Sequence, residues 1–279
     1  MVRTDVQPEI GAERIASFQE EVLGWYAENK RDLPWRGAAD PYHILVSEIM
    51  LQQTQVSRVV PKYREFLLRF PTLSGLARAR ADELLRAWQG LGYNRRAVRL
   101  REAAKVVATR HAGALPETVA ELEALPGVGS YTARAVACFA FGLHTSVIDT
   151  NVRRVLAGFA GRTLSERETE ALARRMLPAG KAADWNQALM DYGAAARQGA
   201  APRGSGRHEP FADSNRFWRG RIVDTLRHHE SLELGGLLGS LPPQVDEMRV
   251  RGLLRILHEE GLVTYDATDD RVTLGVAED

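Results

Sequence analysis

Apolar side chains recur along most of the chain at the three- and four-residue spacing of one helical face. In residues 12–29, Ile15, Phe18, Val22, Leu23 and Tyr26 lie at roughly helical spacing and predict an amphipathic helix. No alternating apolar–polar run typical of a strand occurs in the first 200 residues, so we predict that this part is all-α. The same periodicity predicts further helices over residues 41–54, 58–69, 82–89, 94–110, 117–124, 131–141, 150–160, 165–175 and 184–194.

The pattern changes near residue 196. The next 20 residues are rich in Gly, Ala, Pro, Arg and Ser, a composition typical of an exposed linker or loop. Two helices are then predicted over 217–229 and 245–260, followed by strands at 262–265 and 271–274. The acidic turn between the strands would repel phosphates, which favours a packing cap over a DNA-binding wing. We therefore predict a helical domain over residues 1–195, a linker over 196–215, and a winged-helix-like α+β domain over 216–279.

Composition excludes several classes of protein. The formal net charge of +1 over 279 residues gives no bulk positive field. No run of 18 apolar residues is present, so we expect no membrane span, and residues 1–15 lack the apolar core of a signal peptide. A single cysteine, Cys138, allows no intramolecular disulfide, which fits a reducing cytoplasm.

A glycine-punctuated hairpin between two predicted helices is the strongest candidate for a binding site. Leu125 and Pro126 end the first helix, because the residue before a proline is pushed out of the α region. Gly127 and Gly129 give the backbone freedom to turn and let a ligand approach closely. The next helix begins with free N–H groups and the positive end of its dipole, which favours an anion. We expect the segment Gly127, Val128, Gly129 and Ser130 to hold a DNA phosphate.

Several motifs in a consistent order resemble the adenine DNA glycosylase (MutY) family of the helix–hairpin–helix glycosylase superfamily. The hairpin is one of them, and the resemblance covers about residues 27–193. The others are RDLPWR at 31–36, DPY at 40–42, VSEIMLQQTQV at 46–56, WQGLGY at 88–93 and NQALMDYG at 186–193. The resemblance implies two helical lobes with a substrate cleft between them and a double-stranded DNA substrate that carries a mispaired or damaged base. It also implies a monomer in the cytoplasm, associated with the nucleoid.

The resemblance implies four catalytic residues. Breaking an N-glycosidic bond builds positive charge on the sugar, so the reaction needs an anion there and an acid at the leaving base. Asp149 matches the residue that stabilises the cation or bonds to it, and Glu48 matches the acid that protonates adenine and later activates water. The apolar neighbours of Glu48 would favour its protonated form. Tyr131 and Asn151 would orient the sugar end of the site, and Asp149 would also cap the helix that follows it.

The resemblance also implies residues for base extrusion and recognition. Gln53 and Tyr93 would fill or wedge the base stack. The arginine side chain suits bidentate contact with phosphate. We therefore expect the arginines that follow the GLGY turn, Arg95 and Arg96, to bind DNA. The predicted adenine pocket is lined by Arg31, Trp35, Leu51 and Asp191.

The chain departs from the family in two places. Members usually carry four cysteines after the position of Gly193 that hold an iron–sulfur cluster, and here that stretch has none. Four thiolates are not available, so we expect no cluster and no other cofactor, apart from a monovalent cation that the hairpin could hold. The tail is also shorter than the family's 8-oxoguanine-reading domain and shows no match to its recognition loop.

Taken together, these residues predict a monofunctional adenine DNA glycosylase acting opposite 8-oxoguanine or guanine. Tyr131 stands where lyase-competent members of the superfamily have a lysine, and a tyrosine cannot form the imine that β-elimination requires. A glycosylase that removes thymine or uracil opposite G shares the hairpin, the tyrosine and the aspartate, so it stays an alternative. A non-catalytic DNA-binding module is a third, although such a module would need neither carboxylate.

Overall fold

The computed structural model describes residues 10–197 and 214–275. These residues form two compact units. Of the described residues, the first unit contains residues 10–41, 117–123 and 129–197. The second unit contains residues 42–116, 124–128 and the C-terminal segment 214–275. The chain therefore passes between the units at the predicted hairpin. No helix among residues 10–197 and 214–275 is long and apolar enough to cross a membrane.

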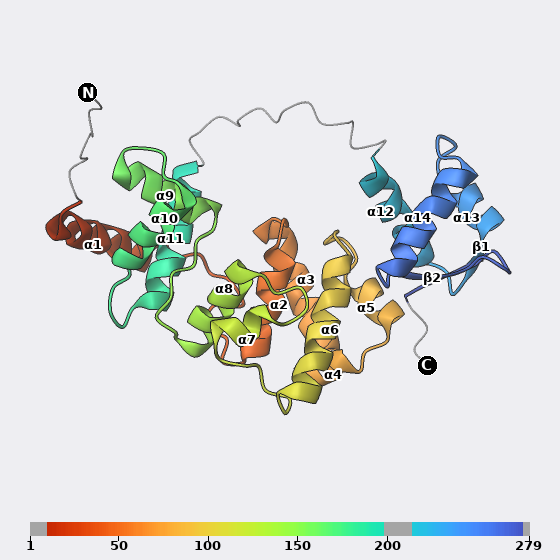
Figure 1. The fold of residues 1–279 in the computed structure, drawn as a ribbon, viewed down its shortest axis with the longest axis horizontal. Coiled ribbons are helices and arrows are strands. Elements are labelled where there is room, and N and C mark those ends of the chain that lie inside the picture. Colours follow the sequence, from red (N-terminus) through yellow and green to blue (C-terminus); the bar gives the residue numbers. More distant parts are fainter. Residues whose placement is uncertain (1–9, 198–213, 276–279) are drawn as a thin grey trace, which may run out of the picture. The chain divides into compact units, whose positions relative to one another are not determined.

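The described residues of the first unit form helices joined by loops, built around the pair α9 (Thr150–Ala160) and α11 (Ala182–Arg197) (Figure 1). Its core buries the predicted face of the first helix, including Val22, against Leu156, Met176 and Trp185. Ser165 begins one of the later helices through a reciprocal capping box with Glu168, which satisfies N–H groups that a helix start leaves open. The helices of this unit are α1 (Ala12–Asn29), α7 (Val119–Glu123), α8 (Ser130–Phe141), α9 (Thr150–Ala160), α10 (Glu166–Arg175) and α11 (Ala182–Arg197).

The helices in the first part of the second unit pack around Trp88, which is fully buried. Its ring meets Phe66 edge-on, with the ring centroids 5.7 Å apart. The helix that carries the VSEIML motif is buried along almost its whole length. These helices are α2 (Pro41–Leu51), α3 (Val56–Arg69), α4 (Leu73–Ala77), α5 (Ala81–Ala87) and α6 (Arg95–Arg110).

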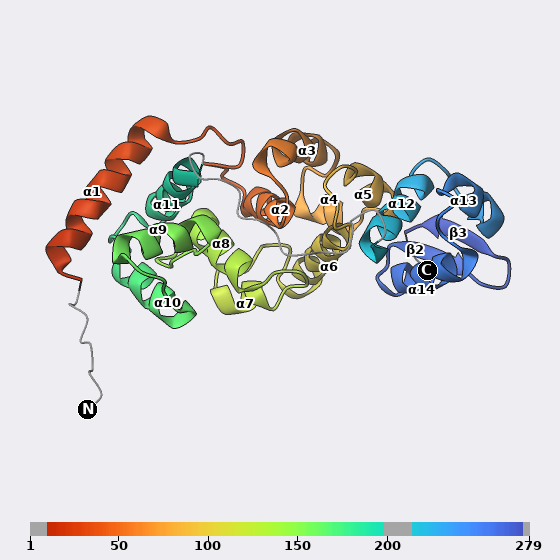
Figure 2. The same ribbon diagram turned by 90° about the horizontal axis from the view of Figure 1, so that it is seen from above.

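The C-terminal segment forms three helices and a small antiparallel sheet, which confirms the predicted winged-helix-like class (Figure 2). The sheet has the strand order β1–β3–β2. The central strand β3 pairs with β2, where Val263 lies opposite Leu274, and with β1, where Leu232 lies opposite Val272. The short α4, α13 and β1 were not predicted. The elements are α12 (Asn215–Leu226), β1 (Leu232–Glu233), α13 (Leu234–Ser240), α14 (Glu247–Glu259), β2 (Val263–Asp266) and β3 (Arg271–Leu274).

The C-terminal segment packs on the helices of the second unit. Arg227 is buried and donates hydrogen bonds to the Leu85 carbonyl at 3.0 Å and to Asn94 Oδ1 at 2.8 Å. A Cβ on Gly275 would lie 2.7 Å from the Ala81 Cβ, so the end of β3 lies directly against α5. The segment thus groups with residues 42–116 in one compact unit. Most of the predicted linker, residues 198–213, lies outside the described residues.

Candidate active site

Asp149 is the residue immediately before α9 and caps that helix, as predicted. Its Oδ1 accepts the backbone N–H groups of Asn151 at 2.8 Å and of Val152 at 2.7 Å. Its Oδ2 accepts the side-chain amide of Asn151 at 2.8 Å. Three donors therefore fix the direction of this half-buried carboxylate, and the positive end of the α9 dipole favours its negative charge.

A second layer of contacts holds Asn151 in turn. Arg154 donates to Asn151 Oδ1 at 3.1 Å and to the Gly193 carbonyl at 3.0 Å, so it links α9 to α11. Gly193 allows the two helices to approach, because a Cβ there would lie 2.7 Å from the Asn151 carbonyl oxygen. The sequence did not identify Arg154 as part of the site, since its partner is 39 residues away.

The loop that leads into Asp149 is held by Asn186, which is almost fully buried. Its Oδ1 accepts the Val147 backbone N–H at 2.8 Å, and its amide donates to the Thr145 carbonyl at 2.9 Å. The same amide lies 3.4 Å from the Cys138 sulfur. Burial raises the pKa of the Cys138 thiol to about 11, so this thiol stays protonated at neutral pH. Asn186 belongs to a motif recognised in the sequence, but only the folded chain shows that it fixes this loop.

The hairpin has the backbone that its glycines predicted. Gly127 adopts a φ of +78°, and a Cβ there would lie 2.6 Å from the Arg99 Cβ on α6. Gly129 is extended and precedes the first turn of α8, whose N–H groups have no acceptor within the helix. The Val128 side chain is buried while Gly129 and Ser130 are exposed, so Val128 presents only its backbone. Tyr131 follows and packs half-buried against the core of the first unit.

Glu48 lies on α2 in the second unit and is only 6% exposed. Its neighbours along the chain, Ser47, Ile49 and Met50, are buried as well. Leu51 ends the same helix and is half-buried.

Two residues with unusual backbone angles stand at the predicted wedge positions. Gln53 has a φ of +54° and Tyr93 a φ of +46°, conformations that are uncommon outside glycine and concentrate at functional sites. Gln53 is exposed and Tyr93 is 36% exposed. The Thr54 hydroxyl donates to the Leu91 carbonyl at 3.2 Å and so joins the two turns.

Arg96 locks these two turns together, a structural function that the sequence did not predict for it. One guanidinium nitrogen donates to the carbonyls of Ile49, Met50 and Gln52 at 2.6–2.8 Å. The other donates to Thr54 and to the carbonyls of the GLGY turn. The open carbonyls at the end of α2 are thereby satisfied. Burial lowers the pKa of Arg96 to about 10, which still leaves it charged at neutral pH. Arg95, in contrast, is exposed.

Asp191 is 2% exposed and fully engaged in the first unit. Arg36 donates to both of its oxygens at 2.7 and 2.8 Å, and Arg31 donates through its Nε at 2.6 Å and its backbone N–H at 3.0 Å. Both Arg31 and Asp191 were predicted to line the base pocket. The structure shows them paired with each other, with Arg36 as a partner that the sequence did not single out. Trp35, beside them in the chain, is buried.

The predicted residues fall into two groups, one in each compact unit. The first unit holds Asp149, Asn151, Tyr131, Arg31, Trp35, Asp191, Gly129 and Ser130; the second holds Glu48, Leu51, Gln53, Tyr93, Arg95, Arg96, Gly127 and Val128. The predicted sugar-side residues thus lie on α8 and at the start of α9, and the predicted acid and wedge residues lie on α2, just after it and in the GLGY turn. The two predicted carboxylates come from different units.

The residues present do not fit an iron–sulfur cluster. Such a cluster needs four thiolate ligands, and the only cysteine of the chain, Cys138, is buried inside α8 with a protonated thiol. The described residues also contain no group of three or more His, Cys, Asp or Glu side chains arranged to hold a metal ion.

Comparisons with known proteins agree on one family. A family model described as the HhH-GPD superfamily of base excision DNA repair proteins matches residues 46–179. Adenine DNA glycosylase of Mycolicibacterium smegmatis is 41% identical over 232 residues, which cover 74% of this chain and 79% of that protein. Adenine DNA glycosylase of Homo sapiens is 40% identical over 195 residues, which cover 64% of this chain and 36% of that protein.

Solved structures show the same fold. A thermostable thymine-DNA glycosylase has a TM-score of 0.61 and 31% identity, with 65% of this chain and 87% of that chain covered. An endonuclease III bound non-covalently to DNA also has a TM-score of 0.61, with 20% identity and coverage of 70% and 91%. Because the identity to endonuclease III is only 20%, this similarity shows a shared fold alone.

Proposed function

The chain belongs to the adenine DNA glycosylase family of the HhH-GPD superfamily, and from that premise we propose that it removes adenine mispaired with 8-oxoguanine or guanine in double-stranded DNA. The reaction is hydrolysis of the N-glycosidic bond, the first step of base excision repair. The observation that carries this proposal is the Asp149 carboxylate, which three donors hold at the start of α9.

Asp149 acts on the sugar. As the bond between the sugar C1′ and the base breaks, its electron pair leaves with the base and positive charge develops on the sugar. A preorganised carboxylate stabilises that charge without reorienting during the reaction. Asn151 keeps Oδ2 in place, and Arg154 keeps Asn151 in place.

Glu48 acts on the base and the water. It donates its proton to a ring nitrogen of the leaving adenine, which leaves as the neutral base. The resulting carboxylate then takes a proton from water as the water oxygen bonds to C1′, which restores the acid and leaves an abasic site. Glu48 is only 6% exposed, so bulk water has little access to the carboxyl group during this cycle.

The absence of a lysine at position 131 argues for a monofunctional enzyme. A lyase of this superfamily forms an imine between an amine and the sugar, and the phenol of Tyr131 has no amine to offer. We therefore expect the reaction to stop at the abasic site.

One observation favours a second candidate function. The chain is 31% identical to a thymine-DNA glycosylase and covers 87% of it. Removal of thymine or uracil opposite G would use the same hairpin, tyrosine and aspartate, so these features do not separate the two functions.

A panel of duplexes decides between them. Each duplex would carry one of A:8-oxoG, A:G, T:G, U:G or inosine, and the products would be separated with and without alkali. We expect cleavage after alkali with the two adenine mispairs only. Excision of thymine or uracil but not adenine would support the second candidate. Strand scission without alkali would refute the monofunctional mechanism.

The Asp149→Asn variant tests the chemistry. Asparagine caps a helix about as well as aspartate, so the fold should survive while the charge is lost. We expect the single-turnover rate to fall by at least about 100-fold, with little change in duplex affinity. Asp246→Asn is the matched control, because Asp246 also caps a helix, α14, through its side chain and lies outside the proposed active site. An unchanged single-turnover rate for Asp149→Asn would contradict the proposed catalytic function of Asp149.

A further inference from the structure

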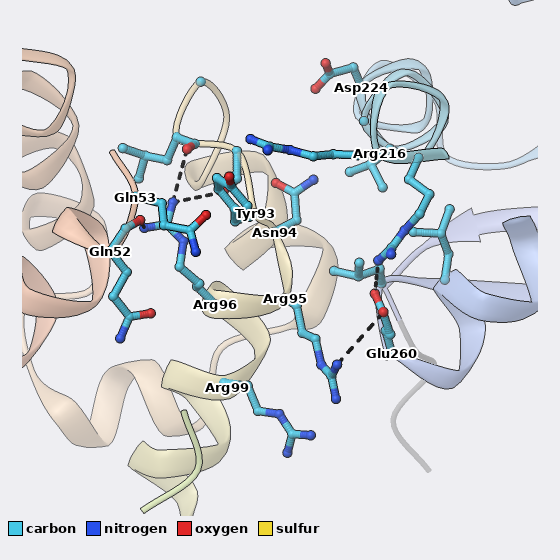
Figure 3. Close-up of a pocket in the computed structure, with 18 of the residues that line it drawn as sticks. Gln52, Gln53, Tyr93, Asn94, Arg95, Arg96, Arg99, Arg216, Asp224 and Glu260 are labelled. Carbon is cyan, nitrogen blue, oxygen red and sulfur yellow. Dashed lines mark hydrogen bonds and ion pairs between the residues drawn. The ribbon is translucent and has the colours of Figure 1, made fainter. Parts of the chain in front are cut away.

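A groove of about 820 Å³ lies within the second unit, between α12 and the GLGY turn with the start of α6 (Figure 3). Eight arginines line it, against two carboxylates, Asp224 and Glu260. The chain as a whole is nearly neutral, with a formal charge of +1, so this concentration of one charge is local. A concave surface of this kind raises the local concentration of a polyanion.

Half of these arginines serve the fold or are neutralised. Arg96 binds the carbonyls at the end of α2, and Arg227 is buried against Leu85 and Asn94. Arg219 forms an ion pair with Glu260. Arg99 pairs with Glu102 three residues on, but both side chains are at least 40% exposed, and such a surface pair is weak.

The other four arginines, Arg58, Arg95, Arg216 and Arg221, are all exposed. Arg95 is 54% exposed, and its nearest carboxylate, Glu260 at 4.0 Å, is already paired with Arg219. Arg216 and Arg221 are exposed on α12, and Arg221 has no carboxylate partner among residues 10–197 and 214–275. The groove therefore combines charge from α6 with charge from the C-terminal segment.

Arg216 also contacts the predicted wedge residue. Its guanidinium carbon lies 4.1 Å from the centroid of the Tyr93 ring, and that of Arg96 lies 5.5 Å from the same centroid. Figure 3 shows the Arg216 side chain extending from α12 toward Tyr93. A cation over a tyrosine face is attracted by the ring quadrupole, so the contact helps to hold a side chain whose backbone has a positive φ.

We propose that α12 is a DNA-binding element, in which Arg216 and Arg221, with Arg95 of α6, bind backbone phosphates of the duplex beside Tyr93. This proposal depends on the proposed function in one respect: both take duplex DNA as the ligand. Phosphate contacts of this kind position a duplex without reading its sequence, and Arg216 couples that contact to the wedge. The acidic turn of the wing takes no part in the groove, since Asp270 is paired with Arg251 and neither lines it.

The test measures affinity and its salt dependence on a duplex that carries a reduced abasic site. Such a duplex resembles the product of any monofunctional glycosylase, so the result does not depend on which base the enzyme removes. For the full chain with Arg216→Ala and Arg221→Ala together, we expect at least a tenfold rise in Kd. The slope of log K against log salt should fall by roughly 0.9 for each phosphate that the variant no longer binds.

Two further variants keep the test decisive. Arg255→Ala removes one exposed charge from α14, outside the groove, and should leave the Kd and the slope unchanged. Arg216→Lys keeps the charge and should retain the salt slope, which shows that the alanine variant acts through charge and not misfolding. An unchanged slope in the double variant, or an equal loss in Arg255→Ala, would overturn the proposal. Loss of adenine excision with normal binding would instead count against the proposed function alone.

Discussion

At the scale of single residues, Asp149 joins a structural and a chemical function in one side chain. Capping uses Oδ1 for two backbone N–H groups, and Asn151 holds Oδ2. Because the cap ties the carboxylate to the axis of α9, any shift of the helix would move the charge. The packing of α9 is therefore part of the proposed catalytic geometry.

Asp191 gives a prediction at the same scale. Burial by itself would raise its pKa, but hydrogen bonds from Arg36 and Arg31 outweigh this and hold the pKa of Asp191 below its ordinary value. A lowered folded-state pKa stabilises the protein above the unfolded-state pKa of about 3.9, and this contribution is lost as the pH falls through the folded-state value. Asp191→Asn should lower the free energy of unfolding at pH 7 by about 2–3 kcal/mol.

Denaturant unfolding measures this loss of stability at several pH values between roughly 3 and 8, a range that includes the titration of a carboxylate of this kind. The difference between the wild type and Asp191→Asn should shrink below about pH 4. Asp269→Asn is the control, because Asp269 is exposed and forms no ion pair within the described part of the chain. A difference that does not depend on pH would show that the charge of Asp191 is not what stabilises the site.

At the scale of elements, the close approach of α9 and α11 is the feature on which the sugar side of the site depends. Gly193→Ala would place a Cβ 2.7 Å from the Asn151 carbonyl oxygen and 2.9 Å from a Val155 methyl. Real Cβ atoms do not approach backbone so closely, so the helices must separate. We expect a loss of about 1–3 kcal/mol in the free energy of unfolding and a slower single-turnover rate.

Gly158→Ala is a matched control on α9, the helix that Gly193 of α11 approaches. Gly158 lies inside α9, and a Cβ there meets nothing within 4 Å. Alanine should therefore stabilise the helix by up to about 1 kcal/mol through its better propensity and leave the rate unchanged. Equal effects of the two substitutions would contradict the importance of the approach between α9 and α11.

At the scale of the whole molecule, the structure assigns the C-terminal segment to the same compact unit as residues 42–116. Arg227 is central to this packing, because its buried guanidinium bonds to Leu85 and Asn94. Burial lowers the pKa of Arg227, and the neighbouring Asp224 carboxylate opposes that shift.

Arg227→Met should therefore leave two acceptors unsatisfied and cost about 2–4 kcal/mol. Hydrogen exchange should show lower protection in α5 and in the start of α6 as well as in α12. The reason is that the hydrogen bonds of Arg227 join the end of α12 to Leu85 of α5 and to Asn94, which precedes α6. Arg255→Met, on the exposed face of α14, should have no such effect. Loss of protection confined to the C-terminal segment would mean that the two parts unfold independently.

Local pattern predicted most of the helices well. The bounds of α1 and α9 agree with the prediction at both ends, because each has a long apolar face and α9 has an aspartate cap. The short α4 (LSGLA) and α13 (LGGLLGS) were missed, because both contain glycine and serine, which have poor helix propensity and are typical of turns. Strand β1 has two residues and exists only through its pairing with β3, which no local pattern reveals.

The sequence by itself determined the family, the fold class, the candidate carboxylates and the exclusion of a four-thiolate cluster. These depend on residue types at short spacing and on local backbone preferences. Only the tertiary structure decided which partner each charge has. It shows that Arg31 and Asp191 neutralise each other, that Arg96 binds carbonyls, and that Arg216 reaches Tyr93 from 123 residues away along the numbering. The physical reason is that a long side chain selects its partner by position in space, and the chain order alone does not contain that position.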